Sequence, residues 1–433
     1  MIENIFIEPN PSIYRRLTSR PKQDTLVLDS IIKDVYDKVE ASGDIALKEF
    51  TERFDGCRVE ALKVTTEEIE YASALVSEAL KRAIKTAKKN IEIFHAAQIV
   101  NPISVKISEG VDCMQKSVAI ERVGIYIPGG TAPLFSTVLM LAVPAILAGC
   151  KEIVLCTPPN RQGAIHPAIL WTAQLCGIDN IYKIGGAQAI AAMSLGTESI
   201  LKVNKVFGPG NQYVTAAKVY AQNYGVAIDM PAGPSELLVY ADETCVPRFV
   251  AADLLSQAEH GTDSQVILVA SNPEIVEGVN REIEAQISGL PRREIATQAL
   301  LNSNAVVISD KKTSFDFINK YAPEHLIIAS ENASDYVEMI INAGSVFLGN
   351  YCPESAGDYA SGTNHTLPTD GWAKSYNGVN VDSFSRKITF QSISKKGIQE
   401  LGETIITMAE NENLQAHANA VKVRLMDLKN ELV

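Results

Sequence analysis

The sequence predicts an α/β protein whose parallel sheets are covered by helices. Short runs rich in β-branched residues alternate with helical segments from about residue 120 to residue 350, and this order is typical of strand–helix–strand units. Several of these runs end in glycine-containing turns that lead directly into a helix. The chain has 433 residues, enough for two or three domains of about 150 residues each.

The first group of expected strands occupies residues 123–127, 152–156, 180–184 and 203–207. Glycine turns follow three of them, at Pro128-Gly129-Gly130, Gly185-Gly186 and Gly208-Pro209-Gly210-Asn211. Ligands bind at the carboxyl ends of strands in open α/β sheets, where helix N-termini present free N–H groups. The usual GxGxxG fingerprint of dinucleotide-binding proteins does not occur in this region. The turns alone therefore fit either a ligand site or tight connections without a ligand.

A second α/β unit is expected to follow, with strands at residues 237–241, 265–270, 305–309, 326–329 and 345–348. The first 100 residues are expected to be helical and to include one long amphipathic helix over 66–98, which Thr65 and Glu68 cap. Residues 349–380 are irregular and rich in aromatic side chains, which favours an ordered functional loop. Residues 397–433 read as a helical tail.

Composition excludes several classes of protein. The 39 basic and 51 acidic residues give a net charge of −12, which argues against a nucleic-acid partner. The longest apolar run, 138–148, is shorter than the roughly 20 residues of a membrane span, and the N-terminus has no signal-peptide pattern. Seven cysteines without a CxxC motif indicate a reducing compartment, with Cys150 and Cys156 buried and inert. We expect a cytoplasmic protein without a membrane partner.

Candidate catalytic residues concentrate in the second half of the chain. Gln257 and His260 lie three residues apart at the end of an apolar helix, so they could hold a metal from one face or cap the helix. Glu324 and His325 stand side by side before a strand. An adjacent carboxylate and imidazole suit general acid–base catalysis, although an ordinary polar loop gives the same pattern.

Further candidates lie in the irregular segment and in the tail. Glu354, Asp358 and His365 are possible metal or substrate ligands, while Glu412 and His417 matter only if the tail docks over a site. A nitrogen- and oxygen-donor set without sulfur would suit zinc, manganese or iron, and its members would be Gln257, His260, Asp358 and His417. Spacing in the sequence does not show whether these four converge.

The motifs resemble those of the histidinol dehydrogenase family over nearly the whole chain. The matching stretches, in chain order, are GIYIPGGTAPLFSTVLMLAVPA, GGAQAIAA, FGPGN, DMPAGPSE, DLLSQAEHG, PEHL, GSVFLG, PESAGDYASGTNH and the tail from Glu412 to His417. The first 25 residues and residues 160–169, which include His166, match weakly.

The resemblance implies an NAD-dependent, zinc-containing enzyme that performs the last step of histidine biosynthesis. Such an enzyme oxidises L-histidinol to L-histidinal and then to L-histidine and reduces two NAD⁺. The resemblance also implies a homodimer with shared active sites, one zinc per subunit, and two Rossmann-like domains that lack the glycine fingerprint. On this basis we expect an arm at 1–22, a first domain at 23–122 and 235–379, a second domain at 123–234, and a tail at 380–433 that reaches the partner subunit.

The resemblance also implies roles for individual residues. The zinc ligands would be Gln257, His260, Asp358 and, from the partner's tail, His417. The acid–base pair would be Glu324 and His325. Besides the zinc ligands and His325, the substrate would contact Ser235 and Glu412. The NAD contacts would be Tyr126, Gln188 and Asn211.

Three other functions stay open at this point. A related dehydrogenase could act on another amino alcohol. A zinc hydrolase could use the same metal ligands with Glu324 as its base, but it would have no use for three glycine-containing turns. A two-domain binding protein without catalysis is typically exported, and no export signal is apparent.

Overall fold

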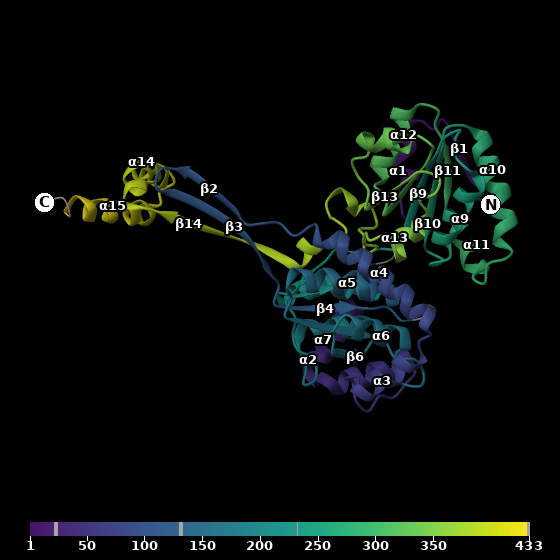
Figure 1. Ribbon diagram of the computed structural model, residues 1–433, viewed down its shortest axis with the longest axis horizontal. Helices are drawn as coiled ribbons and strands as arrows, with labels where there is room; N and C mark the ends of the chain where they lie inside the picture. Colours follow the sequence, from purple (N-terminus) through teal and green to yellow (C-terminus); the bar gives the residue numbers. More distant parts are fainter. Residues whose placement is uncertain (21–24, 130–132, 232, 431–433) are drawn as a thin grey trace. The chain divides into compact units, whose positions relative to one another are not determined.

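The structure, a computed structural model, describes residues 1–20, 25–129, 133–231 and 233–430. The chain forms two units (Figure 1). The larger unit comprises residues 1–98 and 120–384, and the smaller unit comprises 99–119 and 385–433. The predicted α/β class with parallel sheets is confirmed, because both sheets of the larger unit are parallel throughout. No described helix is both long and apolar enough to cross a bilayer.

The first sheet has the strand order β1-β11-β10-β9-β12-β13. Its strands are β1 (Asn4–Ile7), β9 (Glu236–Ala241), β10 (Gln265–Ala270), β11 (Asn304–Val307), β12 (His325–Ala329) and β13 (Ser345–Leu348). Its covering helices are α1 (Tyr14–Leu17), α9 (Pro247–Ala258), α10 (Pro273–Ile287), α11 (Arg293–Leu301) and α12 (Lys311–Tyr321). Alternate residues of β9 enter opposite cores, Leu237 with α9 and Leu238 with α12. Burial on both faces explains the continuous apolar runs of these strands.

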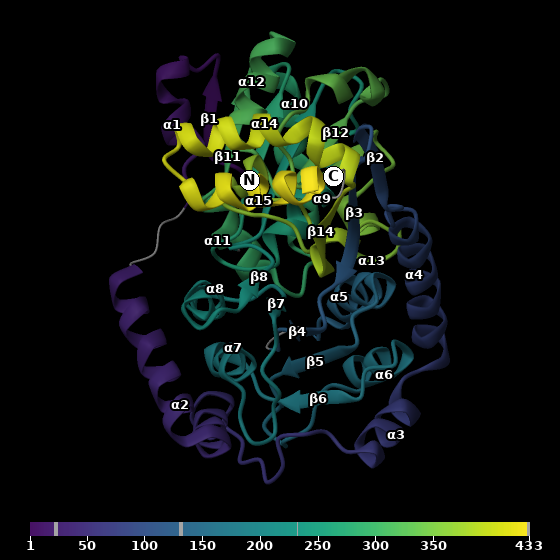
Figure 2. The same ribbon diagram turned by 90° about the vertical axis from the view of Figure 1, so that its left-hand side faces the viewer.

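The second sheet has the strand order β6-β5-β4-β7-β8. Its strands are β4 (Arg122–Tyr126), β5 (Glu152–Thr157), β6 (Asn180–Lys183), β7 (Lys205–Phe207) and β8 (Ala227–Ile228). Helices α5 (Phe135–Ala148) and α6 (Pro167–Leu175) cover one face, and α7 (Gly186–Leu195) and α8 (Gln212–Ala221) cover the other (Figure 2). The strand order reverses between β4 and β7, and such a switch point favours ligand binding at the carboxyl ends of those two strands.

The N-terminal helices cover the second sheet. Helix α2 (Thr25–Asp55) packs on α7 and α8, α3 (Thr66–Leu75) packs on α6, and α4 (Glu78–Ala96) packs on α5. The expected grouping of residues 23–122 with residues 235–379 is therefore wrong for these helices. Their apolar side chains, such as Ile84 and Leu47, belong to the cores of the second sheet.

Two further expectations about the first 100 residues need correction. The expected single helix over 66–98 is two helices, because Val76 has an extended backbone and Ser77 caps α4 by accepting a hydrogen bond from the N–H of Leu80. The capping box of Thr65 and Glu68 is confirmed. Residues 1–22 contribute more than an arm, since β1 pairs with β11 at the edge of the first sheet.

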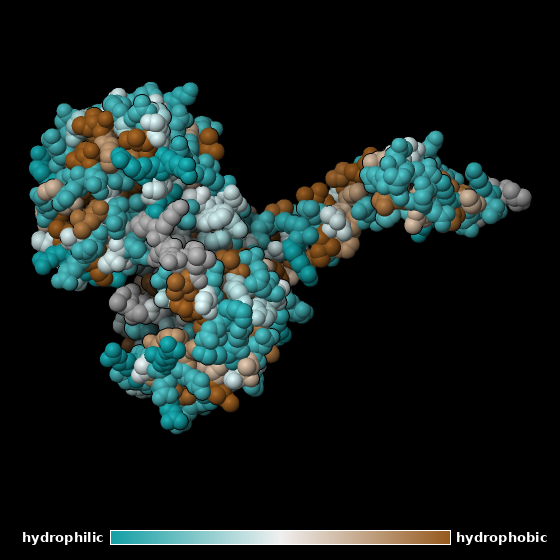
Figure 3. All heavy atoms as spheres, turned by 180° about the vertical axis from the view of Figure 1, so that it is seen from behind, coloured by the Kyte–Doolittle hydropathy of each residue, from teal (hydrophilic) through white to brown (hydrophobic). Residues whose placement is uncertain are grey.

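The smaller unit is a three-stranded antiparallel sheet followed by two helices. Its elements are β2 (Ile103–Ser108), β3 (Val111–Ala119), β14 (Ser385–Ile393), α14 (Lys395–Asn411) and α15 (Gln415–Asn430). The helical tail is confirmed, but the three strands were not expected, and residues 99–119 do not join the first domain. Apolar side chains appear on the surface of this unit (Figure 3). Strand β2 exposes Ile103, Val105 and Ile107.

A buried ion pair holds the glycine turn after β7. The Nζ of Lys218 lies 2.5 Å from Oδ1 of Asp229, and both side chains are at most 2% exposed. Lys218 also donates to the carbonyl of Gly208, while Oδ2 of Asp229 accepts from the N–H of Gly208, each at 2.8 Å. Gly208 has a φ of +129°, and a Cβ there would lie 2.2 Å from the carbonyl oxygen of Tyr126. This position therefore requires glycine.

We expect Lys218→Met to lower the free energy of unfolding by about 3 kcal/mol, because it leaves the Asp229 carboxylate buried without its cation. Denaturant unfolding followed by circular dichroism would measure the change. Lys38→Met is the control, since its ion pair with Asp34 is exposed on both sides and should contribute little. Equal stability of the two variants would contradict a structural role for the buried pair.

Candidate functional site

Glu324 and His325 lie at the amino end of β12, in the connection from α12. The predicted place of the pair at the start of a strand is confirmed, because Glu324 directly precedes β12 and His325 is its first residue. Both side chains are buried, with 6% and 4% exposure. The first residue of the neighbouring strand β9, Glu236, donates its main-chain N–H to Oε2 of Glu324 at 2.8 Å. The acid–base candidates are therefore fixed at the amino ends of two interior strands, β9 and β12.

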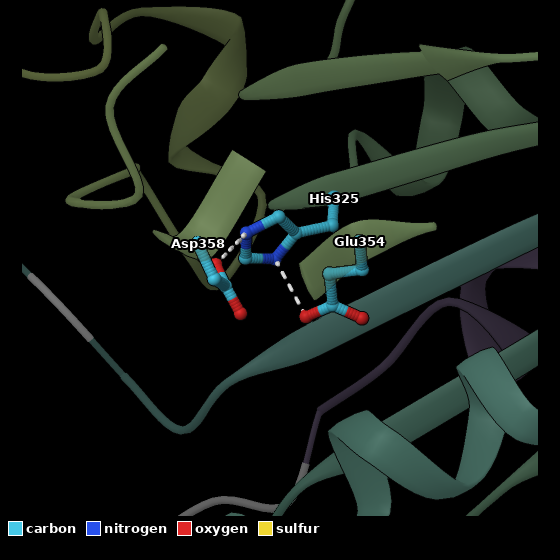
Figure 4. Close-up of side chains that lie close together, drawn as sticks. All are labelled: His325, Glu354 and Asp358. Atoms are coloured by element: carbon cyan, nitrogen blue, oxygen red, sulfur yellow. Dashed lines mark ion pairs between the residues drawn. The ribbon is translucent and has the colours of Figure 1, made fainter. Parts of the chain in front are cut away.

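Three carboxylates surround the imidazole of His325. Its Nδ1 lies 3.6 Å from Oε2 of Glu324 and 3.6 Å from Oε1 of Glu354. Its Nε2 lies 3.7 Å from Oδ1 of Asp358 (Figure 4). Burial alone would lower the pKa of His325, but the charges of Glu354, Glu324 and Asp358 outweigh it and raise the pKa to about 10. The surrounding carboxylates therefore favour the charged form of the imidazole.

Helix α13 (Glu354–Tyr359) delivers two of these carboxylates from the segment that was expected to be irregular. Glu354 and Asp358 are four residues apart, so they project from one face of the helix toward His325. The helix packs closely on β13, because a Cβ at Gly357 would lie 2.7 Å from the ring of Phe347. Burial raises the pKa of Glu354 well above its usual value, and the nearby His325 opposes that shift.

Gln257 joins the same cluster from α9 and is fully buried. The amide orientation that satisfies both neighbours has its nitrogen donating to Oε1 of Glu354 and its oxygen accepting from the N–H of Glu236 at 2.9 Å. The helix ends at Ala258 and Glu259 is its C-cap, so His260 lies outside the helix and is exposed. Gln257 and His260 therefore do not share the last turn of α9 as expected.

His365 borders the cluster on its other side. Its Nδ1 lies 2.9 Å from the main-chain oxygen of Asp358, and its Nε2 lies 3.1 Å from the hydroxyl of Thr137. Burial lowers the pKa of His365, and the charge of Asp358 opposes that shift. His365 is therefore held as a neutral neighbour that fixes the backbone of Asp358.

The donor atoms fit a divalent cation. His325, Glu354 and Asp358 each offer one ligand atom, and these atoms lie within 4.8 Å of one another. Nε2 of His325 and Oε2 of Glu354 are buried and have no hydrogen-bond partner among the described residues. Several carboxylates around one imidazole leave negative charge that a cation would neutralise.

The structure brings together two of the four expected metal ligands, Gln257 and Asp358, through Glu354 and His325. His260 is exposed and lines a cleft that also contains Ser235, Glu324 and His365. Glu412 and His417 belong to the smaller unit, where both are exposed and Glu412 ends α14.

The expected NAD contacts lie at two turns of the second sheet. Asn211 caps α8 through its side-chain oxygen and lines the cleft beside Gly208. Tyr126 and Gln188 are 4% and 2% exposed, and the hydroxyl of Tyr126 accepts from the N–H of Gly186 at 3.0 Å. Both side chains reach the turn before α7, since a Cβ at Gly186 would lie 2.8 Å from Oε1 of Gln188. Of the turn after β4, Gly130 lies outside the described residues.

Several histidines and cysteines are structural. His95 is fully buried in α4, with Nδ1 3.0 Å from the carbonyl of Ile91, as expected of a core histidine. His166 caps α6. Burial raises the pKa of Cys150 to about 11 and also raises that of Cys156, which disfavours a reactive thiolate.

Sequence reasoning missed the role of Glu236. It stands at the start of β9, where every residue is buried, and its main chain contacts Glu324, His325 and Gln257. A charged residue in a fully buried strand needs a partner, so its position before an apolar run was the available signal. That partner is Arg20.

A family model, curated relatives and a solved structure all name one family, and each match covers most of the chain. A family model described as histidinol dehydrogenase matches residues 18–425. Histidinol dehydrogenase of Bacteroides thetaiotaomicron is 56% identical over 421 residues, which cover 97% of this chain and 98% of the relative. The enzyme of Escherichia coli K12 is 52% identical over 402 residues, 92% of each chain. The crystal structure of histidinol dehydrogenase from Elizabethkingia anophelis has a TM-score of 0.96 and 56% identity, with 98% of each chain covered.

We expect Glu354→Gln to lower the pKa of His325 in the metal-free protein, because the Glu354 charge contributes most to raising it. The pKa of His325 lies above its ordinary 6.5, so its protonation stabilises the fold below about pH 6.5, and this stabilisation is lost as the pH rises through about 10. An NMR titration of the imidazole resonances would measure the pKa. Glu121→Gln, in an exposed ion pair with Lys151, is the control. An unchanged pKa of His325 in Glu354→Gln would show that the charge of Glu354 does not raise it.

Proposed function

Because the chain belongs to the histidinol dehydrogenase family, we propose that it oxidises L-histidinol through L-histidinal to L-histidine, reducing one NAD⁺ in each step. This reaction is the last step of histidine biosynthesis. The observation that carries the proposal is the buried Glu324–His325 pair, which stands beside a cluster of possible metal ligands. Glu324 also lines a cleft that extends to the glycine turn after β7.

His325 acts as the general base in both oxidations. In the first, it removes the hydroxyl proton of the alcohol while the carbon loses a hydride. NAD⁺, when bound, accepts that hydride. The base must be neutral to act, and the surrounding carboxylates favour its charged form. A cation bound at Asp358 would reduce this effect, because Asp358 is one of the carboxylates that face His325.

Glu324 activates the water that the second oxidation requires. Its carboxylate accepts a hydrogen bond from the N–H of Glu236 and reaches the cleft. It takes a proton from water as the water oxygen bonds to the aldehyde carbon. The aldehyde oxygen receives the proton that His325 took in the first oxidation, which gives the hydrate and returns His325 to its neutral form. His325 then removes a hydroxyl proton from this hydrate as the second hydride leaves, and the product is the carboxylic acid.

We assign the zinc ligands to Gln257, His260 and Asp358, with His417 supplied by the tail of a second copy of the chain. Zinc, when bound, supplies a Lewis acid that orients the imidazole and amine of the substrate. Ser235 and Glu412 would contact the substrate. The apolar side chains that β2 exposes support burial of the smaller unit against another copy, and hence a homodimer. One zinc per subunit follows from the four ligands assigned to each site.

We place NAD at the turns of the second sheet, with Tyr126, Gln188 and Asn211 as contacts. The backbone at Gly208 leaves no space for a side chain, and α8 begins with the cap Asn211 directly after this turn. The side-chain oxygen of Asn211 already accepts from the N–H groups of Tyr213 and Val214, so the attraction for a pyrophosphate would come from the positive end of the α8 dipole. The switch in strand order between β4 and β7 supports the same location.

We expect the protein to form two NADH per L-histidinol consumed, because both oxidations take place on one site. NADH absorbance at the end of the reaction, set against the histidinol consumed, gives the ratio. Chelation should abolish the reaction and added zinc should restore it. One NADH per L-histidinol with release of the aldehyde would contradict the four-electron oxidation. If no NADH forms, L-histidinol is not the substrate.

The assignment of His417 as a zinc ligand can be tested by measuring zinc content. His417→Asn should lower zinc content, measured by atomic absorption after dialysis, since it removes one of four ligands. His166→Asn is the matched variant, because asparagine can keep the cap of α6 and zinc content should stay full. An unchanged zinc content in His417→Asn would show that His417 is not a zinc ligand.

We expect His325→Asn to lower kcat by about 10²–10⁴-fold with the KM for L-histidinol nearly unchanged, as loss of a general base predicts. Glu324→Gln should instead stop the reaction after the first oxidation and give about one NADH per L-histidinol. Steady-state kinetics and product analysis measure both. A raised KM with unchanged kcat in His325→Asn would show that the residue only binds substrate.

A further inference from the structure

The main chain of Glu236 supports the catalytic pair directly. Its N–H donates to Oε2 of Glu324 at 2.8 Å, and its carbonyl oxygen lies 3.4 Å from Nδ1 of His325. The same N–H lies 2.9 Å from the amide oxygen of Gln257. A displacement of this one residue would therefore disturb the carboxylate of Glu324, to which its N–H donates.

The side chain of Glu236 is held by Arg20. Nε of Arg20 donates to Oε1 at 2.9 Å and Nη2 donates to Oε2 at 2.8 Å, so the guanidinium binds the carboxylate with two parallel hydrogen bonds. The N–H of Asp370 donates to Oε1 at 2.8 Å. The side chains of Arg20 and Glu236 are 11% and 2% exposed, so water competes little for this pair.

Arg20 also holds the segment that leads into Glu324. Nη2 donates to the carbonyl of Tyr321 at 2.8 Å, and the guanidinium carbon lies 3.7 Å from the centroid of the Tyr321 ring. Tyr321 ends α12, and only Ala322, with a φ of +54°, and Pro323 separate it from Glu324. One guanidinium thus joins the strand that hydrogen-bonds Glu324 to the helix end that precedes it.

We propose that Arg20 and Glu236 are positioning residues that hold Glu324 in place for water activation; this inference rests on the proposed function. Neither is a catalytic residue, because both act through the main chain of Glu236 and the connection after Tyr321. Lysine cannot replace Arg20, since a single ammonium neither forms the double hydrogen bond nor stacks flat on a ring. Small displacements of a reacting group reduce rates strongly.

The test compares Arg20→Lys with Arg122→Lys. Arg122 also makes an ion pair, with Glu152, and a carbonyl contact, with Lys202, but it lies at the start of β4 in the second sheet. We expect Arg20→Lys to lower kcat for NADH formation from L-histidinol by about 10- to 100-fold, with KM changed less than about threefold. Arg122→Lys should stay within about twofold. An equal effect of both variants, or a loss of kcat that matches a loss of folded protein in thermal melting, would overturn the proposal.

A double variant separates positioning from general damage. In the Glu324→Gln background only the first oxidation remains, so adding Arg20→Lys should lower its rate by less than about threefold, because the two changes act on one group. A further 10- to 100-fold loss in this background would show that Arg20 does not act through Glu324. If the effects of Arg20→Lys and Glu324→Gln on kcat multiply in this way, the proposal is overturned.

The failure of the proposed function would be distinguishable. If the unmodified protein forms no NADH from L-histidinol, that function is refuted, and the crystal structure of Arg20→Lys then decides the positioning role. A Glu324 carboxylate displaced from the N–H of Glu236 would support it. A hydrogen bond kept at 2.8 Å would overturn it.

Discussion

The charge balance around the imidazole of His325 is the constraint on which the candidate site depends. Burial disfavours any isolated charge, yet Glu324, Glu354 and Asp358 all approach this ring. One imidazolium cannot neutralise three carboxylates. The surplus of negative charge explains why the cluster fits a cation. It also explains why the fully buried amide of Gln257 donates a hydrogen bond to Glu354.

The fold meets this constraint by building the site on rigid elements. His325 and Glu236 begin two adjacent strands of the first sheet, and Gln257 lies in the last turn of α9. The short helix α13 adds Glu354 and Asp358 and is pressed against Phe347. Ligands are usually found at the carboxyl ends of parallel strands. Here the proposed catalytic pair lies at the amino end of β12, while the glycine turns follow the carboxyl ends of strands in the second sheet.

Local patterns in the sequence predicted local structure well. The bounds of β10 and β13 agree with the expected ones, because apolar runs between turn residues are strong strand signals. Which sheet the N-terminal helices cover was not predictable, since an amphipathic face does not specify its partner. The exposed strand β2 gave no burial pattern to recognise.

The sequence predicted the adjacent residues of the candidate site but not the contacts between distant ones. The adjacency of Glu324 and His325 stood out in the sequence, but their contacts with Glu354 and Gln257 depend on elements far apart in the chain. The roles of His260 and His417 stay predictions. Arg20 could not be linked to Glu236 from the sequence, because 215 residues lie between the two.

The path of the chain has a consequence for its synthesis on the ribosome. Strand β1 leaves the ribosome first, but its partner β11 lies at residues 304–307, so Asn4 and Asn304 pair only after most of the polypeptide has been made. The helices and strands of the second sheet are complete by residue 228. The second sheet can therefore pair its strands while the N-terminal strand is still unpaired, and Val379 and Phe384 join its core later. The first sheet, which carries the proposed catalytic pair, cannot be completed until β13 has been made.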